Sequence, residues 1–240
     1  MATFPLNFQN LYEINVTRNA TEKKWARLAA GISSVTPSNN DNVDQSAYLD
    51  GNGYGSSDVI GAQKTYAFSG HRKEGDTAQD YIFDDIQERL GEDRKTEFRH
   101  TSSSGKVTYG ACTICNIVDG GGDANAKSDI SFEIHINGAP TITPGSTAPK
   151  LEVTVAAGSA DGYTKATATV GAGNHLAYTL RNSALSPNGN SFIFGLTSYT
   201  SGADIKASAG QELNIFELDE NERVVKFNAH TLAASDIKSE

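Results

Sequence analysis

Alternation of apolar and polar residues dominates the first part of the chain and predicts β-strands. It is clearest over residues 128–137, where every second residue is apolar: Ile130, Phe132, Ile134 and Ile136. Because successive side chains of a strand point to opposite faces, this pattern predicts a strand with one buried face. Shorter patterns of the same kind predict strands over residues 13–17, 24–35, 63–69, 96–100 and 106–118. We therefore expect a β domain here.

One segment has helical periodicity instead. Its apolar residues recur at the three- and four-residue spacing of one buried helical face: Ile82, Phe83, Ile86 and Leu90. Thr77 is the expected N-cap with Asp80 three residues later, and Gly91 is the expected C′ residue. The pattern predicts one α-helix over about residues 77–90, which covers a sheet edge or plugs the end of a barrel.

Two segments lack strand or helix patterns and are candidates for contacts with other molecules. Residues 38–61 are rich in Asn, Asp, Ser and Gly, and loops of this length are usually functional or disordered. We interpret them as an exposed hairpin or contact loop. The sequence of residues 1–11 predicts an extended arm. This arm is either a frayed terminus or a segment that docks onto a neighbouring molecule. The candidate inter-subunit contact residues are Phe4, Leu6, Phe8, Leu11, Tyr48, Leu49, Tyr54, Val59 and Ile60.

A change in composition divides the chain in two. Residues 140–149 are rich in proline and carry no charge, so we place a boundary between a domain of residues 1–145 and one of residues 150–240. The second domain has six candidate strands at short spacing, over residues 151–155, 164–170, 176–181, 191–196, 212–218 and 224–229. Turn signals such as Asp161-Gly162 separate them. This rhythm predicts a small Ig-like β-sandwich.

The charge balance argues against nucleic-acid recognition. The 240 residues include 29 acidic and 20 basic side chains, which give a net charge of −9, and no basic stripe is present. Specific binding of a phosphate backbone needs such a stripe. No apolar run is long enough to cross a membrane, and the N-terminus lacks the pattern of a signal peptide. We therefore expect a soluble protein that is made in a cytoplasm.

No residue pattern indicates catalysis or a cofactor. Cys112 and Cys115 form a CxxC motif, but residues three apart on a strand face opposite sides, so we interpret them as core residues. The five histidines lack metal-ligand spacing, and no nucleophile elbow or phosphate-binding loop is present. Asp50, Asn52 and Asp58 only loosely match a calcium loop, which no acidic residue completes at its twelfth position. We expect no catalytic, metal-binding or cofactor-binding residues.

The order of these features resembles the major tail tube protein of long-tailed phages of Gram-positive hosts, in the wider tail-tube fold of contractile tails and injection machines. Four parts carry the resemblance: Lys-Trp-Ala-Arg-Leu-Ala-Ala-Gly-Ile at residues 24–32, the long segment 38–61, the strand, turn and helix over residues 67–82, and the paired strands up to Ile136. Residues 150–240 are similar to the decorating domains that such proteins carry on the tube exterior.

The resemblance implies a mainly β protein, with a tail-tube-type β-barrel or sandwich, one flanking helix and an Ig-like domain. It implies a virion protein, made in the bacterial cytoplasm, that forms stacked hexameric rings as a conduit for DNA ejection. The long loop and the arm would join ring to ring. Implied partners are further copies of the chain, a tape measure protein and the tail terminator and distal tail proteins, with DNA passing non-specifically through the lumen.

The alternative function is a two-domain β binding module that recognises a host surface or a carbohydrate. Sugar-binding faces usually display aromatic side chains, and the second domain offers several: Tyr163, Tyr178, Phe192, Phe194 and Tyr199. A glycan-binding screen distinguishes this alternative from the tail-tube hypothesis.

Overall fold

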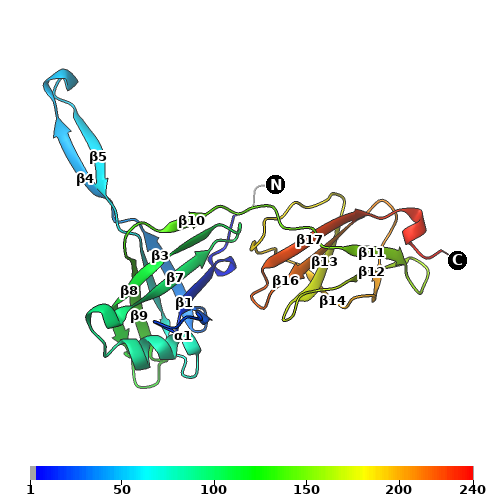
Figure 1. The fold of residues 1–240 in the computed structure, drawn as a ribbon, viewed down its shortest axis with the longest axis horizontal. Coiled ribbons are helices and arrows are strands. Elements are labelled where there is room, and N and C mark those ends of the chain that lie inside the picture. Colours follow the sequence, from blue (N-terminus) through cyan, green and yellow to red (C-terminus); the bar gives the residue numbers. More distant parts are fainter. Residues whose placement is uncertain (1–3, 240) are drawn as a thin grey trace. The chain divides into compact units, whose positions relative to one another are not determined.

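A computed structural model describes residues 4–239, which fold as a mainly β protein with one short α-helix and two compact units. One unit, which we call the barrel unit, comprises Leu11–His100 and Thr108–Ile142. The other, the sandwich unit, comprises the described residues from Thr143 onward together with residues 4–10 and Thr101–Val107. The expected fold class is confirmed (Figure 1). Residues 4–10 of the predicted arm lie in the sandwich unit, and Leu11 lies in the barrel unit.

The barrel unit is built on one sheet with the strand order β2-β1-β7-β8-β9-β6-β3, and β10 adds to β8. The strand bounds are β1 (Leu11–Asn15), β2 (Trp25–Arg27), β3 (Ile32–Ser38), β6 (Thr65–His71), β7 (Lys95–Thr101), β8 (Val107–Asp119), β9 (Asp129–Ile136) and β10 (Thr141–Thr143). The strands predicted over residues 63–69, 96–100, 106–118 and 128–137 are confirmed to within a few residues. The segment predicted as one strand over residues 24–35 is two strands, β2 and β3.

This sheet must curl, because its two edge strands are consecutive in the chain. β2 ends at Arg27 and β3 begins at Ile32. The extended backbone between these two residues spans about 18 Å at most. Seven flat strands would separate the edges by about 29 Å. The link itself hydrogen-bonds to strands on both sides, with the Leu28 amide 2.8 Å from the Tyr12 carbonyl and the His71 amide 2.8 Å from the Gly31 carbonyl.

Aromatic side chains fill the interior of the curled sheet. Phe68 of β6 and Phe132 of β9 are register partners whose rings stack at 4.9 Å. Tyr12 of β1 meets Phe68 edge to face at 5.6 Å, although the two strands lie on opposite sides of the sheet order. The alternating apolar residues of β9 all point into this core. The sheet is therefore rolled around one continuous hydrophobic cluster.

The helix packs on this core but differs from its predicted form. α1 (Thr77–Asp80) continues as a π-helical segment (Tyr81–Ile86), in which Ile82, Phe83 and Ile86 are buried as predicted. The N-cap is Asp76, whose carboxylate accepts a 3.0 Å hydrogen bond from the Gln79 amide, and not Thr77. The predicted end at residue 90 is also wrong. The Gln87 amide bonds to the carbonyl of Ile82, five residues back, so the helix widens and ends, and Leu90 is 82% exposed. A 3₁₀ turn follows at Gly91–Arg94.

The helix also secures the link between β2 and β3, the two edge strands of the curled sheet. The buried side chain of Gln79 donates to the Ala30 carbonyl in the link between β2 and β3, and its oxygen accepts from the Lys73 amide at 2.7 Å. Two glycines permit the close backbone contact beside it. A Cβ atom at Gly70 would lie 2.1 Å from the Gly31 carbonyl oxygen, and Gly31 itself has a φ of +72°. Larger residues cannot replace these glycines without separating β3 from β6.

We therefore predict that Gly70→Ala lowers the free energy of unfolding by about 2 kcal/mol or more, because the new methyl group meets backbone atoms that cannot rotate away. Chemical denaturation followed by the fluorescence of Trp25, the single tryptophan, measures the loss. Gly51→Ala is the matched control, since a Cβ atom there has no neighbour within 4 Å. If Gly70→Ala lowers the free energy of unfolding no more than Gly51→Ala does, the close backbone contact between Gly31 and Gly70 is not needed for stability.

The sandwich unit contains two sheets, β11-β12-β15 and β14-β13-β16-β17. The bounds are β11 (Val153–Ala157), β12 (Tyr163–Ala168), β13 (His175–Arg181), β14 (Thr197–Tyr199), β15 (Asp204–Lys206), β16 (Glu212–Leu218) and β17 (Val224–Thr231), with 3₁₀ turns at Asn7–Gln9 and Ala234–Asp236. Apolar residues from both sheets share one cluster, among them Ala166, Ile205, Leu176 and Ile215. The strand predicted over residues 191–196 is wrong, because only Phe192 makes a bridge there, to Arg223.

A buried arginine holds the three segments of the sandwich unit together. Arg223 is 2% exposed, and its guanidinium donates to the carbonyls of Gln9 at 2.7 Å, Ser102 at 3.2 Å and Asn190 at 3.4 Å. The same group lies 5.7 Å from the ring centre of Phe192. Residues 4–10 and Thr101–Val107 are therefore bonded parts of this unit and not appendages.

Candidate assembly surface

Residues 42–61 form a two-stranded antiparallel ribbon that pairs only with itself. Its strands are β4 (Asn42–Ala47) and β5 (Gly55–Gly61), and neither adjoins another strand in the described part of the chain (Figure 1). Every residue of the ribbon except Ser46 is exposed. The interpretation of residues 38–61 as an exposed hairpin therefore agrees with the structure.

The neck of the ribbon has its own hydrogen bonds. The Asn40 side chain donates to the Gln63 carbonyl at 3.1 Å and to the Thr65 hydroxyl at 2.9 Å. The Gln63 amide donates to the Asn39 carbonyl at 2.8 Å, and the Lys64 ammonium donates to the Asn39 side chain at 3.0 Å. These bonds lie outside residues 42–61, so the neck does not depend on the ribbon itself.

The ribbon carries five of the predicted contact residues. Tyr48, Leu49 and Tyr54 lie at its tip, where Asn52 and Gly53 turn the chain with positive φ angles of 52° and 85°. Val59 and Ile60 lie on β5. Val43, an apolar residue in a polar segment, was not among the predicted contact residues and pairs with Val59. All six apolar side chains are at least 45% exposed. Monomeric proteins rarely leave large contiguous apolar patches in water.

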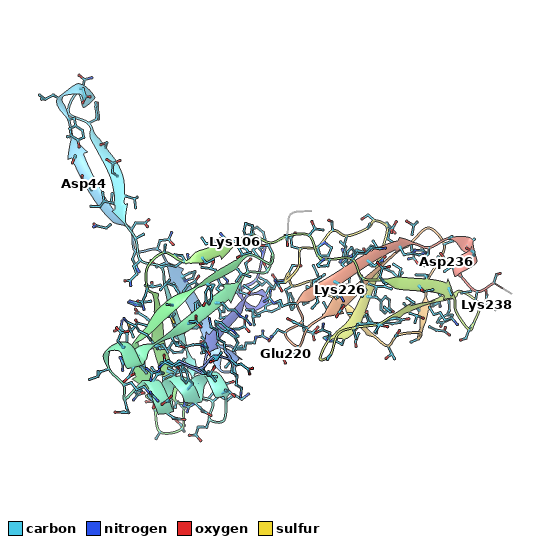
Figure 2. The ribbon with its side chains drawn as sticks, in the orientation of Figure 1. Asp44, Lys106, Glu220, Lys226, Asp236 and Lys238 are labelled. Atoms are coloured by element: carbon cyan, nitrogen blue, oxygen red, sulfur yellow. The ribbon has the colours of Figure 1, made fainter. Side chains whose placement is uncertain are left out.

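The two faces of the ribbon differ in chemistry. The register places Val43 opposite Val59 on one face and Asp44 opposite Asp58 on the other. Figure 2 shows Asp44 on the ribbon. Like charges directly opposite each other destabilise a sheet. Residues 42–61 contain three aspartates and neither lysine nor arginine, and none of the aspartates forms an ion pair within residues 4–239.

The other predicted contact residues do not belong to the ribbon. Phe4, Leu6 and Phe8 belong to the sandwich unit and are exposed there. The Phe8 ring meets Phe192 and Phe194 edge to face, with centroids 6.0 and 6.4 Å apart. Leu11 is a correction to the predicted set. It is the first residue of β1 and only 5% exposed, because it has joined the sheet and does not continue the arm.

The remaining candidate chemistry has structural explanations. Cys112 and Cys115 lie on β8 as free thiols, and burial raises the pKa of both, which opposes formation of the reactive thiolate. A polar pocket surrounds Arg72, whose guanidinium is paired with Asp80 at 2.9 Å and Asp84 at 3.0 Å. Over residues 4–239 no group of three or more His, Cys, Asp or Glu side chains is arranged to hold a metal ion. The same residues include no helix long and apolar enough to cross a membrane.

Comparisons with known proteins find similarity to two groups of proteins. A family model described as the C-terminal domain of the S-layer protein SbsC matches residues 156–235, about a third of the chain. No curated protein sequence matches the chain significantly. Among solved structures, domains 7, 8 and 9 of SbsC are similar over 57% of this chain, with 21% identity and a TM-score of 0.39; the chain spans 39% of that structure.

Two further solved structures come from phage-like particles. The tail of an empty GTA particle, refined with C6 symmetry, is similar over 58% of this chain and 99% of its own, with 18% identity and a TM-score of 0.46. The tube-terminating cap of the anti-feeding prophage is similar over 60% of this chain and 93% of its own, with 14% identity and a TM-score of 0.41. The chain thus has distant structural similarity both to tails of phage-like particles and to S-layer domains.

Proposed function

We propose that this chain is a structural virion subunit that polymerises as stacked hexameric rings into a phage tail tube, a conduit for DNA. The observation that carries the proposal is the β4–β5 ribbon, which pairs with nothing else in the described chain and keeps six large apolar side chains in water. Such a ribbon contributes nothing to the hydrophobic core of its own unit. Exposed apolar side chains lower the solubility of a protein, and their presence on the ribbon is explained if another molecule covers them.

The sheet edges and the overall charge support the same proposal. β2 and β3 are the edges of the barrel-unit sheet among the described residues; an open edge that would invite aggregation in a monomer can serve as a contact between copies in a closed ring. The net charge of −9 would keep a DNA backbone from adhering to a tube made of this chain. Under this proposal the chain catalyses no reaction, and its partners are further copies, a tape measure protein and the proteins at the two ends of the tail.

Sedimentation velocity over a concentration series tests the proposal in solution. A subunit that forms rings and then stacks them populates a hexamer and, at higher concentration, an open series of larger species. Substituting the tip residues Tyr48, Leu49 and Tyr54 with serine should reduce both the hexamer and the larger species, because the ribbon is the proposed contact between copies. A single monomeric species at every concentration would overturn the proposal.

A second candidate function is recognition of a cell-surface carbohydrate by the sandwich unit. It is favoured by Phe4, Phe8 and Phe194, which are exposed on this unit, and by the match of residues 156–235 to an S-layer domain model. Exposed aromatic rings are the usual platform for sugars. A glycan screen of the full chain tests it, with Phe194→Ala expected to abolish any binding. A screen in which no glycan binds, or glycan binding that Phe194→Ala leaves unchanged, would overturn this second candidate function.

A further inference from the structure

The edge strand β2 carries a charge opposite to that of the ribbon. Arg27 on β2 and Lys24 just before it are exposed, and neither forms an ion pair within the described residues. Arg27 lies directly across from Glu13 of β1. That carboxylate is already bound by Arg99, with Nη2 of the guanidinium 2.7 Å from Oε1. The neighbouring Lys23 is likewise occupied, by Glu97 at 2.7 Å. Lys24 and Arg27 are therefore available to another molecule.

The two edges of the barrel-unit sheet are not equivalent. β2 is a short edge next to free cations, whereas β3, Ile-Ser-Ser-Val-Thr-Pro-Ser, has no charged residue and contains Pro37, which cannot donate a ladder hydrogen bond. Basic residues on an edge discourage indiscriminate strand pairing. They still admit an acidic partner, since opposite charges attract across strands.

The ribbon has the properties of an acidic partner for the β2 edge. Within residues 4–239 its strands have free outer edges and its aspartates form no ion pair, and Asp44 and Asp58 repel each other across the ribbon until a cation comes between them. We propose that the β2 edge of one copy of the chain receives the β4–β5 ribbon of the next copy, with Asp44 and Asp58 facing Lys24 and Arg27.

This assignment rests on the proposed self-assembly and names the two surfaces that meet. The contact joins different surfaces of two copies, so each copy offers one ribbon and one edge and the contact repeats from copy to copy. Salt weakens contacts between exposed charges. Assembly through this contact should therefore need a higher protein concentration as the ionic strength rises.

Charge exchange tests the assignment. The variants are Asp44→Lys with Asp58→Lys, and Lys24→Glu with Arg27→Glu. Each pair of substitutions alone should raise the critical concentration for assembly at least about tenfold, because opposed charges become like charges. An equimolar mixture of the two variant proteins should assemble near the wild-type concentration, since the altered ribbon of one matches the altered edge of the other. A single chain with all four substitutions should do the same.

The controls separate this contact from general effects of charge. Lys73→Glu with Lys127→Glu makes the same change of charge at exposed barrel-unit positions away from β2 and should leave the critical concentration unchanged. Two results would overturn this assignment and leave the proposed function standing. The first is that the charge-reversing substitutions leave assembly unchanged. The second is that neither the mixture nor the fourfold variant restores assembly. A wild-type chain that never assembles would overturn both.

Discussion

Replacing residues 42–61 with a two-residue turn is expected to abolish assembly and to leave the fold intact. All ribbon residues except Ser46 are exposed, and among the described residues the ribbon belongs to no hydrophobic cluster and its strands pair only with each other. The hydrogen bonds of Asn40 and Gln63 close the neck without them. The free energy of unfolding of the barrel unit should therefore change by less than about 0.5 kcal/mol.

Two measurements separate assembly from folding in this variant. Trp25 fluorescence during denaturation reports the stability of the barrel unit, and light scattering reports assembly. The matched control replaces three exposed apolar residues outside the ribbon, Leu90, Val118 and Ile142, with serine. This control should assemble as the wild type does. A ribbon deletion that still forms large assemblies would show that the apolar ribbon is not the contact.

Substitution of Arg223 is expected to have the largest effect on the stability of the sandwich unit. In Arg223→Met the carbonyls of Gln9, Ser102 and Asn190 lose a charged donor inside a buried site. Hydrogen bonds to charged groups contribute more than neutral ones, and breaking a buried charged network costs about 3 kcal/mol or more. The sandwich unit should therefore unfold at a clearly lower denaturant concentration.

Circular dichroism during denaturation measures this loss, and Trp25 fluorescence shows whether the barrel unit shares it. Arg181→Met is the matched control, because Arg181 is exposed at the end of β13. If the sandwich unit of Arg223→Met and that of Arg181→Met have the same denaturation midpoint, the role assigned to Arg223 is contradicted. The same bonds explain why a fragment of residues 150–240 should be less stable than the full chain, since it lacks Gln9 and Ser102.

Periodicity was enough to predict most strands of the barrel-unit core and the existence of one helix. The alternation over residues 128–137 and the face formed by Ile82, Phe83 and Ile86 come from burial on one side, which the sequence records directly. Boundaries were less predictable. The apolar spacing gives no sign of the π-helical turn that ends the helix before Leu90, and the three-residue strands β14 and β15 are too short for any periodicity to show.

Contacts between distant segments could not be predicted. The partners of Arg223 lie 121 and 214 residues away, at Ser102 and Gln9, so no local pattern indicates them. The exposed hairpin could be predicted from composition, but its two faces could not. Asp44 meets Asp58 because the turn between β4 and β5 sets a register that holds from the Ala47–Gly55 pair to the Val43–Val59 pair and shifts only at Asn42.

Electron microscopy of the negatively stained full chain over a concentration series tests the central claim most directly. Our account predicts rings with sixfold symmetry and, at higher concentration, hollow tubes built of stacked rings, both of which disappear in the ribbon deletion. Single monomeric particles at every concentration, even when the chain is produced together with proteins that initiate tail tubes, would contradict the account.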